Sequence, residues 1–152
     1  MHLRPARPDE AALLSDLAVR SKGHWGYDAE FLAGSRRVLS LQPEEVLPHR
    51  TTVAEVEGRV VGFYTLVGGP PVAVLEHLFV EPADIGTGIG RRLWTHAVDT
   101  AARLGIERFT IDSDPFAEAF YLAMGAKRTG ESPSEVITGR VLPQLTWVTL
   151  DG

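Results

Sequence analysis

The sequence predicts a single α/β domain of the α+β kind, in which a mixed, mostly antiparallel central sheet is flanked by helices. Two β-branched runs, residues 51–57 and 60–67, are joined by a glycine turn and indicate an antiparallel hairpin. A buried-strand pattern from residue 72 is followed by a long helical pattern and a short strand at residues 108–112. This β-α-β succession indicates one parallel strand pair. A length of 152 residues suits one domain over residues 1–152.

The remaining elements follow from capping and periodicity. Residues 2–6 suggest a first strand, and Asp9 and Asp28 are expected to cap two successive helices. The long helix begins near Ile89 and ends before Gly105. Asp114-Pro115 predicts the start of the last helix, because a capping side chain is followed by proline in the first turn. Two final strands are expected at residues 126–130 and 144–150.

The composition narrows the class of function. Hydrophobic residues make up 44% of the chain and charged residues 23%, as in ordinary globular proteins. A net charge of −5 without a basic stripe argues against nucleic acid and anionic membranes as partners. The chain has no cysteine, and His24, His49 and His96 have no partners at metal-ligand spacing, so no metal is expected. The first residues contain no apolar signal core, which favours a cytoplasmic location.

Three glycines alternate between the buried strand and the long helix, at Gly86, Gly88 and Gly90. Glycine has no Cβ and adopts positive φ at little cost, so a ligand can approach this backbone closely. The first amides of the helix and the positive end of its dipole would lie behind the turn. Such helix starts bind phosphates, and Arg91 and Arg92 add positive charge. The alternative to a phosphate or pyrophosphate site is a tight turn without a ligand.

The turn resembles motif A of the GCN5-related N-acetyltransferase (GNAT) family. A dinucleotide-binding Rossmann turn has its third glycine one residue later and lies near the first strand, so it fits less well. In the GNAT family a Val-x-Pro strand end leads into Gln/Arg-x-x-Gly-x-Gly/Ala, whose amides hold the pyrophosphate of acetyl-CoA. The match here is Val80-Glu81-Pro82 followed by Gly86-Thr87-Gly88-Ile89-Gly90. Ile85 departs from the family, since it stands where Gln or Arg is usual.

A second stretch, residues 117–126, resembles motif B of the same family. The usual form is Ala-x-x-Phe-Tyr, three residues, then Gly-Phe; Phe120-Tyr121 is intact here and Ala126 replaces the aromatic residue. Phe116 stands where an Asn often contacts the cofactor. The resemblance now covers the chain and implies the acyl-CoA N-acyltransferase fold, with acetyl-CoA as acetyl donor. It implies cofactor contacts at Phe79, Val80, Ile85, Gly86, Thr87, Gly88, Ile89, Gly90, Arg91, Ser113, Phe116 and Phe120.

The resemblance also implies that an amine attacks the thioester directly in a ternary complex. Tyr121 is the expected acid, because a phenol with a pKa of about 10 can protonate a thiolate whose thiol titrates at about 8.5. A backbone amide near residues 79–80 is the expected oxyanion donor. The base is open between Glu76, His77, Asp112 and a water chain. Adjacent strand residues face opposite sides, so only one of Glu76 and His77 aims at the cleft unless a bulge intervenes.

Two loops, residues 21–28 and 132–143, are expected to line the acceptor site. His24, Trp25 and Tyr27 are candidate contacts, because binding residues favour loops on a rigid scaffold. The two aromatic residues could instead fill the side of the domain. Arg140 could bind an acidic group of the acceptor, or it could be an exposed surface charge.

The sequence thus predicts an acetyl-CoA-dependent N-acetyltransferase acting on a primary amine of a small molecule or peptide. The alternative is a weakly active or inactive acyl-CoA-binding sensor or regulatory module. Ile85 and Phe116 favour this alternative, and the intact Tyr121 argues against it. Homodimers are common in the family, so a homodimer is compatible with the resemblance.

Overall fold

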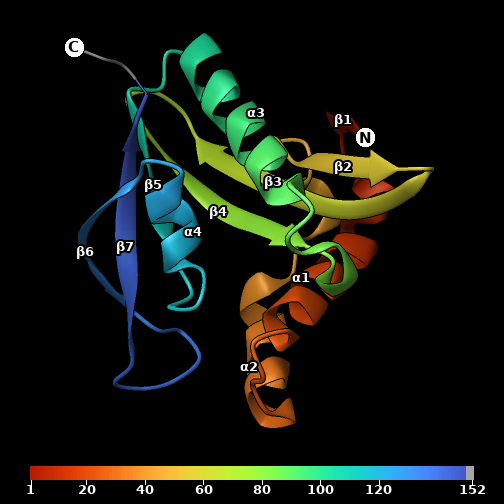
Figure 1. Cartoon of the computed structure of the whole chain (residues 1–152), viewed down its shortest axis with the longest axis vertical. Helices are drawn as coiled ribbons and strands as arrows, with labels where there is room; N and C mark the ends of the chain where they lie inside the picture. Colours follow the sequence, from red (N-terminus) through yellow and green to blue (C-terminus); the bar gives the residue numbers. More distant parts are fainter. Residues whose placement is uncertain (150–152) are drawn as a thin grey trace.

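The fold is a seven-stranded sheet with helices on both faces, described for residues 1–149 of a computed structural model (Figure 1). The elements are β1 (His2–Pro5), α1 (Ala11–Gly23), α2 (Ala29–Leu39), β2 (Thr52–Val56), β3 (Arg59–Gly68), β4 (Val72–Val80), α3 (Ile89–Arg103), β5 (Arg108–Asp112), α4 (Glu118–Ala123), β6 (Lys127–Pro133) and β7 (Val141–Val148). The strands are ordered β1-β2-β3-β4-β5-β7-β6. Within residues 1–149 only β4 and β5 pair in parallel, which confirms the predicted fold class. Leu150, the end of the predicted last strand, lies outside the described residues.

Local signals set some element ends, but the expected cap at Asp9 is wrong, because α1 begins at Ala11 with Glu10 at its N-cap and no side-chain cap. Asp28 caps α2 by accepting a hydrogen bond from the Phe31 amide at 2.8 Å. The β2–β3 turn holds Glu57 and Gly58 at φ values of 51° and 76°, a left-handed pair that matches the twist of a tight hairpin. The predicted start of the last helix was wrong. The Asp114 carboxylate accepts from the Phe116 amide at 2.8 Å and forms a local turn, so α4 begins only at Glu118.

Alternate residues of the central strands face two separate cores. Val53 packs with Leu14 of α1 on one face, whereas its neighbour Ala54 belongs to the core beneath α3, with Leu93. This alternation follows from the two-residue period of a strand. Figure 1 shows α3 and α4 over one face of the sheet and α1 on the other, with α2 packed beside α1. Within residues 1–149 there is no helix with the length and apolar character that a membrane span needs.

Strands β4 and β5 pair over a short stretch and then diverge. Their parallel pairing joins Val72–Val74 to Arg108–Thr110, whereas β3 follows β4 as far as Val80. Figure 1 shows the two strands separating toward the C-terminal end of β4. The second half of β4 therefore has no strand beside its outer edge in the described part of the chain, and the sheet opens there.

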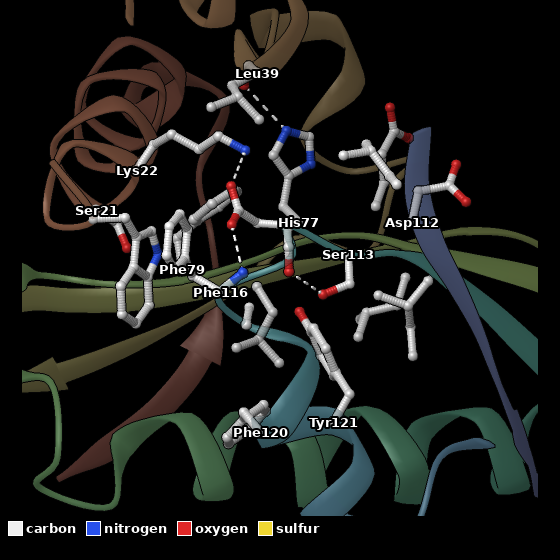
Figure 2. Close-up of a pocket in the computed structure, with 18 of the residues that line it drawn as sticks. Ser21, Lys22, Leu39, His77, Phe79, Asp112, Ser113, Phe116, Phe120 and Tyr121 are labelled. Carbon is white, nitrogen blue, oxygen red and sulfur yellow. Dashed lines mark hydrogen bonds and ion pairs between the residues drawn. The ribbon is translucent and has the colours of Figure 1, made fainter. Parts of the chain in front are cut away.

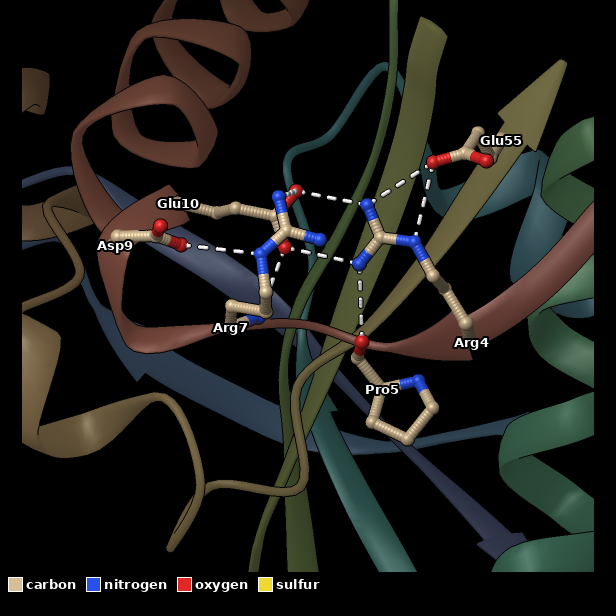
Figure 3. Close-up of polar contacts among 6 residues, drawn as sticks. All are labelled: Arg4, Pro5, Arg7, Asp9, Glu10 and Glu55. Carbon is tan, nitrogen blue, oxygen red and sulfur yellow. Dashed lines mark hydrogen bonds and ion pairs between the residues drawn. The ribbon is translucent and has the colours of Figure 1, made fainter. Parts of the chain in front are cut away.

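A cluster of charged side chains ties β1 to β2 and to the start of α1 (Figure 3). Both terminal nitrogens of Arg4 donate to the Glu10 carboxylate, at 3.0 and 2.8 Å, and Arg4 Nε donates to Glu55 at 3.1 Å. The Arg7 amide also donates to Glu10, at 2.8 Å. The Glu10 side chain is 7% exposed. The hydrogen bonds from Arg4 lower the pKa of Glu10 below its usual value.

We predict that Glu10→Gln destabilises the fold at neutral pH but much less in acid. A carboxyl group whose pKa is lowered in the folded state contributes its full stability above the unfolded pKa. That contribution is lost as the pH falls through the folded pKa. The substitution should lower the free energy of unfolding by about 1–3 kcal/mol at pH 7. Urea unfolding across the pH range measures this, with Asp9→Asn, a 79% exposed side chain, as control. A difference between Glu10→Gln and the parent that does not change with pH would contradict the assignment.

Candidate active site

A cavity of about 950 Å³ occupies the opening between β4 and β5. Its walls come from the second half of β4, the start of α3, the end of β5, α4, the ends of α1 and α2, and residues 132–142. Figure 2 shows Lys22 reaching into this space from one side and Tyr121 from the opposite side. Both predicted motifs and both predicted acceptor loops therefore contribute to one cavity.

The glycine-rich turn presents its backbone to the cavity. Gly86 and Gly88 have φ values of 87° and 89°, which strain any residue that carries a Cβ, and Gly88 is the N-cap of α3. Gly86, Gly88, Gly90 and Arg91 line the cavity. The amides of the first turn of α3 lack carbonyl partners within the helix, so they are available to an anion. A Cβ at Gly90 would lie 3.3 Å from a ring carbon of Phe120, which also lines the cavity.

Two residues of this motif direct their side chains elsewhere. Thr87 donates its hydroxyl hydrogen to the Asp84 carbonyl, and Ile89 is buried in the core beneath α3. Neither side chain lines the cavity, so the predicted cofactor contacts of Thr87 and Ile89 depend on their backbone amides. Motif spacing cannot show this, because the turn decides which side chains point inward. Ile85 lines the cavity and is 37% exposed.

A β-bulge at Glu76 separates the two candidate bases on β4. His77 pairs with Thr65 of β3, and the register then shifts so that Glu76 is the extra residue. Glu76 is exposed and lines the cavity, whereas His77 is only 4% exposed. Beyond the bulge, Phe79 and Val80 line the cavity along the edge that β5 leaves free.

Both ring nitrogens of His77 are hydrogen-bonded within the protein. Nε2 lies 3.0 Å from the Leu39 carbonyl, which can only accept, so Nε2 carries the proton (Figure 2). Nδ1 lies 2.7 Å from the Thr65 hydroxyl and accepts its hydrogen. Burial lowers the pKa of His77, which keeps the ring neutral. His77 lines the cavity, but these two bonds make it a less suitable base than Glu76, and its ring ties the end of α2 to the bulge.

The Tyr121 hydroxyl points from α4 into the cavity (Figure 2). The residue is 6% exposed and packs against Trp94 and Phe120, with ring centroids 5.8 and 5.2 Å away. The hydroxyls of Tyr27 and Tyr64 bond to Asp114 and His96, but that of Tyr121 has no partner within residues 1–149. Burial, aided by the negative charge of Asp114, raises the pKa of Tyr121. The phenol therefore stays protonated at neutral pH.

The end of β5 carries two cavity residues with local partners. Asp112 Oδ1 accepts from Ser132 at 2.9 Å and from Gln144 at 3.2 Å. The Ser113 hydroxyl donates to the Asp114 carbonyl at 2.7 Å, which leaves the Ser113 oxygen free to accept. Both residues line the cavity, but these bonds hold Asp112 against β7 and make it a less suitable base than Glu76, which has no hydrogen-bond partner for its carboxylate in the described part of the chain.

Aromatic rings from two loops meet beside the cavity. Trp25 stacks on Phe116, with ring centroids 5.6 Å apart and an interplanar angle of 11°. Both residues line the cavity. His24 stands edge-on to Trp25 but does not line the cavity, so its expected contact with the acceptor is corrected. Phe116, at the position where the family often has Asn, contributes a ring surface and no side-chain hydrogen bond.

A charged group connects the predicted acceptor loops to the end of β5. Asp114 Oδ2 accepts from the Lys22 ammonium at 2.7 Å and from the Tyr27 hydroxyl at 2.9 Å. Arg140 donates to the same hydroxyl at 2.8 Å. Arg140 lines the cavity, but Tyr27 does not, so the expected contact of Tyr27 with the acceptor is corrected to a tie between loops. No sequence pattern indicates Lys22, and the pattern at Asp114 predicts only a helix cap.

Comparison with known proteins identifies the family. The model described as the acetyltransferase (GNAT) domain matches residues 40–137, well over half of the chain. The chain therefore belongs to the GNAT acetyltransferase family. No curated protein has significant sequence similarity to it.

Solved structures with the same fold cover nearly the whole chain. A GCN5-related N-acetyltransferase from Rhodopseudomonas palustris has a TM-score of 0.81 at 21% identity, over 97% of this chain and 94% of its own. The PaiA N-acetyltransferase of Thermoplasma acidophilum, solved with coenzyme A, has a TM-score of 0.77 at 17% identity, over 97% and 98%. An aminoglycoside 6′-N-acetyltransferase, also solved with coenzyme A, has a TM-score of 0.75 at 19% identity, over 100% and 99%.

We predict that all three tyrosines of the folded protein titrate above the ordinary pKa of about 10. Burial is the main cause in each case. Because the pKa values of the tyrosines are raised in the folded state, their neutral phenols contribute to the free energy of unfolding. This contribution is complete below the unfolded pKa and is lost as the pH rises through the folded pKa values. Ultraviolet titration of tyrosinate tests this, and the urea-unfolded protein should titrate near the ordinary value. A tyrosine that ionised below that value in the folded state would contradict the assignment.

Proposed function

We propose that this protein is an acetyl-CoA-dependent N-acetyltransferase that acts on a primary amine of a small molecule or peptide. The observation that carries the proposal is that the glycine-rich turn and the Tyr121 hydroxyl face the same cavity. The turn offers backbone amides to a pyrophosphate, and the phenol offers a proton. Family membership and the coenzyme A in two structural neighbours support the same donor.

The residues present fit the phosphate end of acetyl-CoA. Gly86 and Gly88 leave open space where a Cβ would project, so a pyrophosphate can approach their amides. Arg91 lines the cavity beside them and can supply the charge that Ile85 does not. Bound acetyl-CoA would supply the activated acetyl thioester. The free edge of β4 near Phe79 and Val80 would hold the rest of the molecule and provide an amide to the oxyanion.

In the proposed reaction the amine nitrogen forms a bond to the thioester carbonyl carbon, and the carbon–sulfur bond breaks. The leaving thiolate takes a proton from Tyr121, whose raised pKa keeps that proton in place until the carbon–sulfur bond breaks. The nitrogen loses its second proton as the amide forms, and that proton, relayed by water, restores the Tyr121 phenol. The ammonium form of the acceptor must lose its proton before attack. We assign this step to Glu76, because its carboxylate is exposed to the cavity on the bulge of β4. Water can relay the proton where the two groups are not in direct contact.

The acceptor end of the cavity combines apolar walls with polar groups. Apolar contacts come from α2 and the β6–β7 segment, at Phe31, Val38, Leu39, Val136 and Leu142. Trp25 adds a ring surface. The lining supports an amine with an apolar portion as acceptor.

We predict that Gly88→Val prevents acetyl-CoA binding. The valine side chain would stand over the amides, and the φ of 89° would add strain of about 1–3 kcal/mol. Gly58→Val is the matched control, because Gly58 has a φ of 76° in the β2–β3 turn and does not line the cavity. Calorimetric titration with acetyl-CoA, coenzyme A and NAD should show micromolar binding of the first two by the parent and the control. Unchanged affinity in Gly88→Val would remove the pyrophosphate site from this turn.

We predict that Tyr121→Phe lowers kcat about 10²-fold or more, because the proton donor to the thiolate is lost. Its affinity for coenzyme A should change less than about threefold. Thiol release with benzylamine, putrescine and glycinamide as acceptors measures turnover. Tyr64→Phe removes a hydroxyl on α3's side of the sheet and should leave turnover intact. Equal turnover of Tyr121→Phe and the parent would exclude the acid role.

Binding of acetyl-CoA by the parent without transfer to any amine would instead favour the sensor module.

A further inference from the structure

One carboxylate connects the turn after β5 to residues 22–27 beside the cavity. Asp114 follows β5, Lys22 belongs to the last turn of α1, and Tyr27 lies in the α1–α2 loop. Asp114 Oδ2 accepts from both Lys22, at 2.7 Å, and Tyr27, at 2.9 Å. Figure 2 shows Lys22 extending from α1 toward the segment that carries Phe116. The side chains of Lys22 and Asp114 are 14% and 9% exposed, so the ion pair is largely shielded from water.

Tyr27 extends this connection to the β6–β7 segment. Burial raises the pKa of Tyr27, so its hydroxyl remains protonated and can donate to Asp114 while it accepts from Arg140 at 2.8 Å. The Arg140 guanidinium also lies 5.4 Å from the centre of the Tyr27 ring, and the Lys22 ammonium lies 5.6 Å from it. Phe31 of α2 stacks on Tyr27 at 4.1 Å. Both cations thus lie within cation–π distance of the Tyr27 ring, and Asp114 contacts one of them directly and the other through the Tyr27 hydroxyl.

The segment that carries Arg140 is compact and lies against α2. Its ends are joined by a hydrogen bond from the Ser134 amide to the Arg140 carbonyl, at 2.8 Å. A Cβ at Gly34 of α2 would lie 3.1 Å from a methyl carbon of Val136. Apart from its strand ends, this segment has no place in the sheet, so its position depends on side-chain contacts of this kind.

We propose that Asp114 is a positioning residue that assembles the acceptor wall from three segments: the turn after β5, residues 22–27 and residues 134–140. Its other oxygen, Oδ1, accepts from the Phe116 amide at 2.8 Å and shapes the turn beside α4. One side chain therefore sets both the turn next to Tyr121 and the placement of Trp25, Val136 and Arg140, which line the cavity. The expected effect of Asp114 on the KM for the amine rests on the proposed acetyl transfer.

Asp114→Asn keeps the size of the side chain but removes the charge that holds Lys22. It should raise the KM for the amine about 10-fold, while kcat and the KM for acetyl-CoA change less than about threefold. The amine is whichever of benzylamine, putrescine and glycinamide the parent acetylates fastest. Asp16→Asn is the matched control, because it also removes an ion pair between two segments, that of Asp16 in α1 with Arg36 in α2. These two side chains are about half exposed and do not line the cavity. An unchanged KM for the amine in Asp114→Asn would overturn the role in acceptor binding.

Hydrogen exchange tests the same proposal without an acceptor. Asp114→Asn should speed amide exchange in residues 24–28 and 134–140 about fivefold or more, with little change in the core strand β3. Tyr27→Phe, which retains the ion pair and the ring stack, should loosen residues 134–140 alone. Exchange that is unchanged in both segments, or that rises equally in β3, would overturn the proposal. If the parent acetylates none of the amines, the proposed function fails, and the exchange measurement still decides whether Asp114 assembles this wall.

Discussion

The early end of the β4–β5 pairing is the constraint on which the rest of the structure depends. Because only residues 72–74 of β4 pair with β5, the two strands separate and a cavity forms between them. The glycine-rich turn that follows β4 and the α4 helix that follows β5 are thereby brought to the same opening. A fully paired sheet would leave neither a free strand edge nor room for a ligand between the two motifs.

Burial controls the protonation of the groups around this opening. It raises the pKa of Tyr121, which remains a neutral phenol, and it lowers the pKa of His77, which remains a neutral imidazole. The two residues nonetheless have different roles. The Tyr121 hydroxyl faces the cavity without a partner among the described residues, whereas both nitrogens of His77 are bonded to β3 and α2. The bulge that buries His77 leaves Glu76 as the exposed carboxylate.

The two departures from the family pattern acquire a physical meaning in the structure. Ile85 lines the cavity without a charge, and Arg91 lies on the first turn of α3 to provide one. Phe116 cannot hydrogen-bond a ligand through its side chain, but it stacks on Trp25 and joins the cofactor side of the cavity to the α1–α2 loop. The Asp114 carboxylate reinforces this junction, because it accepts from the Phe116 amide and pairs with Lys22 of α1.

The sequence by itself determined the order of the elements, the fold class, the glycine turn and the motif that contains Tyr121. These features depend on residues close together in the chain: hydrophobic periodicity, capping side chains, and glycines where φ is positive. Only the tertiary structure decided that Glu76 is exposed while both ring nitrogens of His77 are hydrogen-bonded within the protein, because a register shift between β3 and β4 separates the two residues. It also decided that Lys22, Tyr27, Asp114 and Arg140 form one group, since these residues meet only when three distant segments pack together.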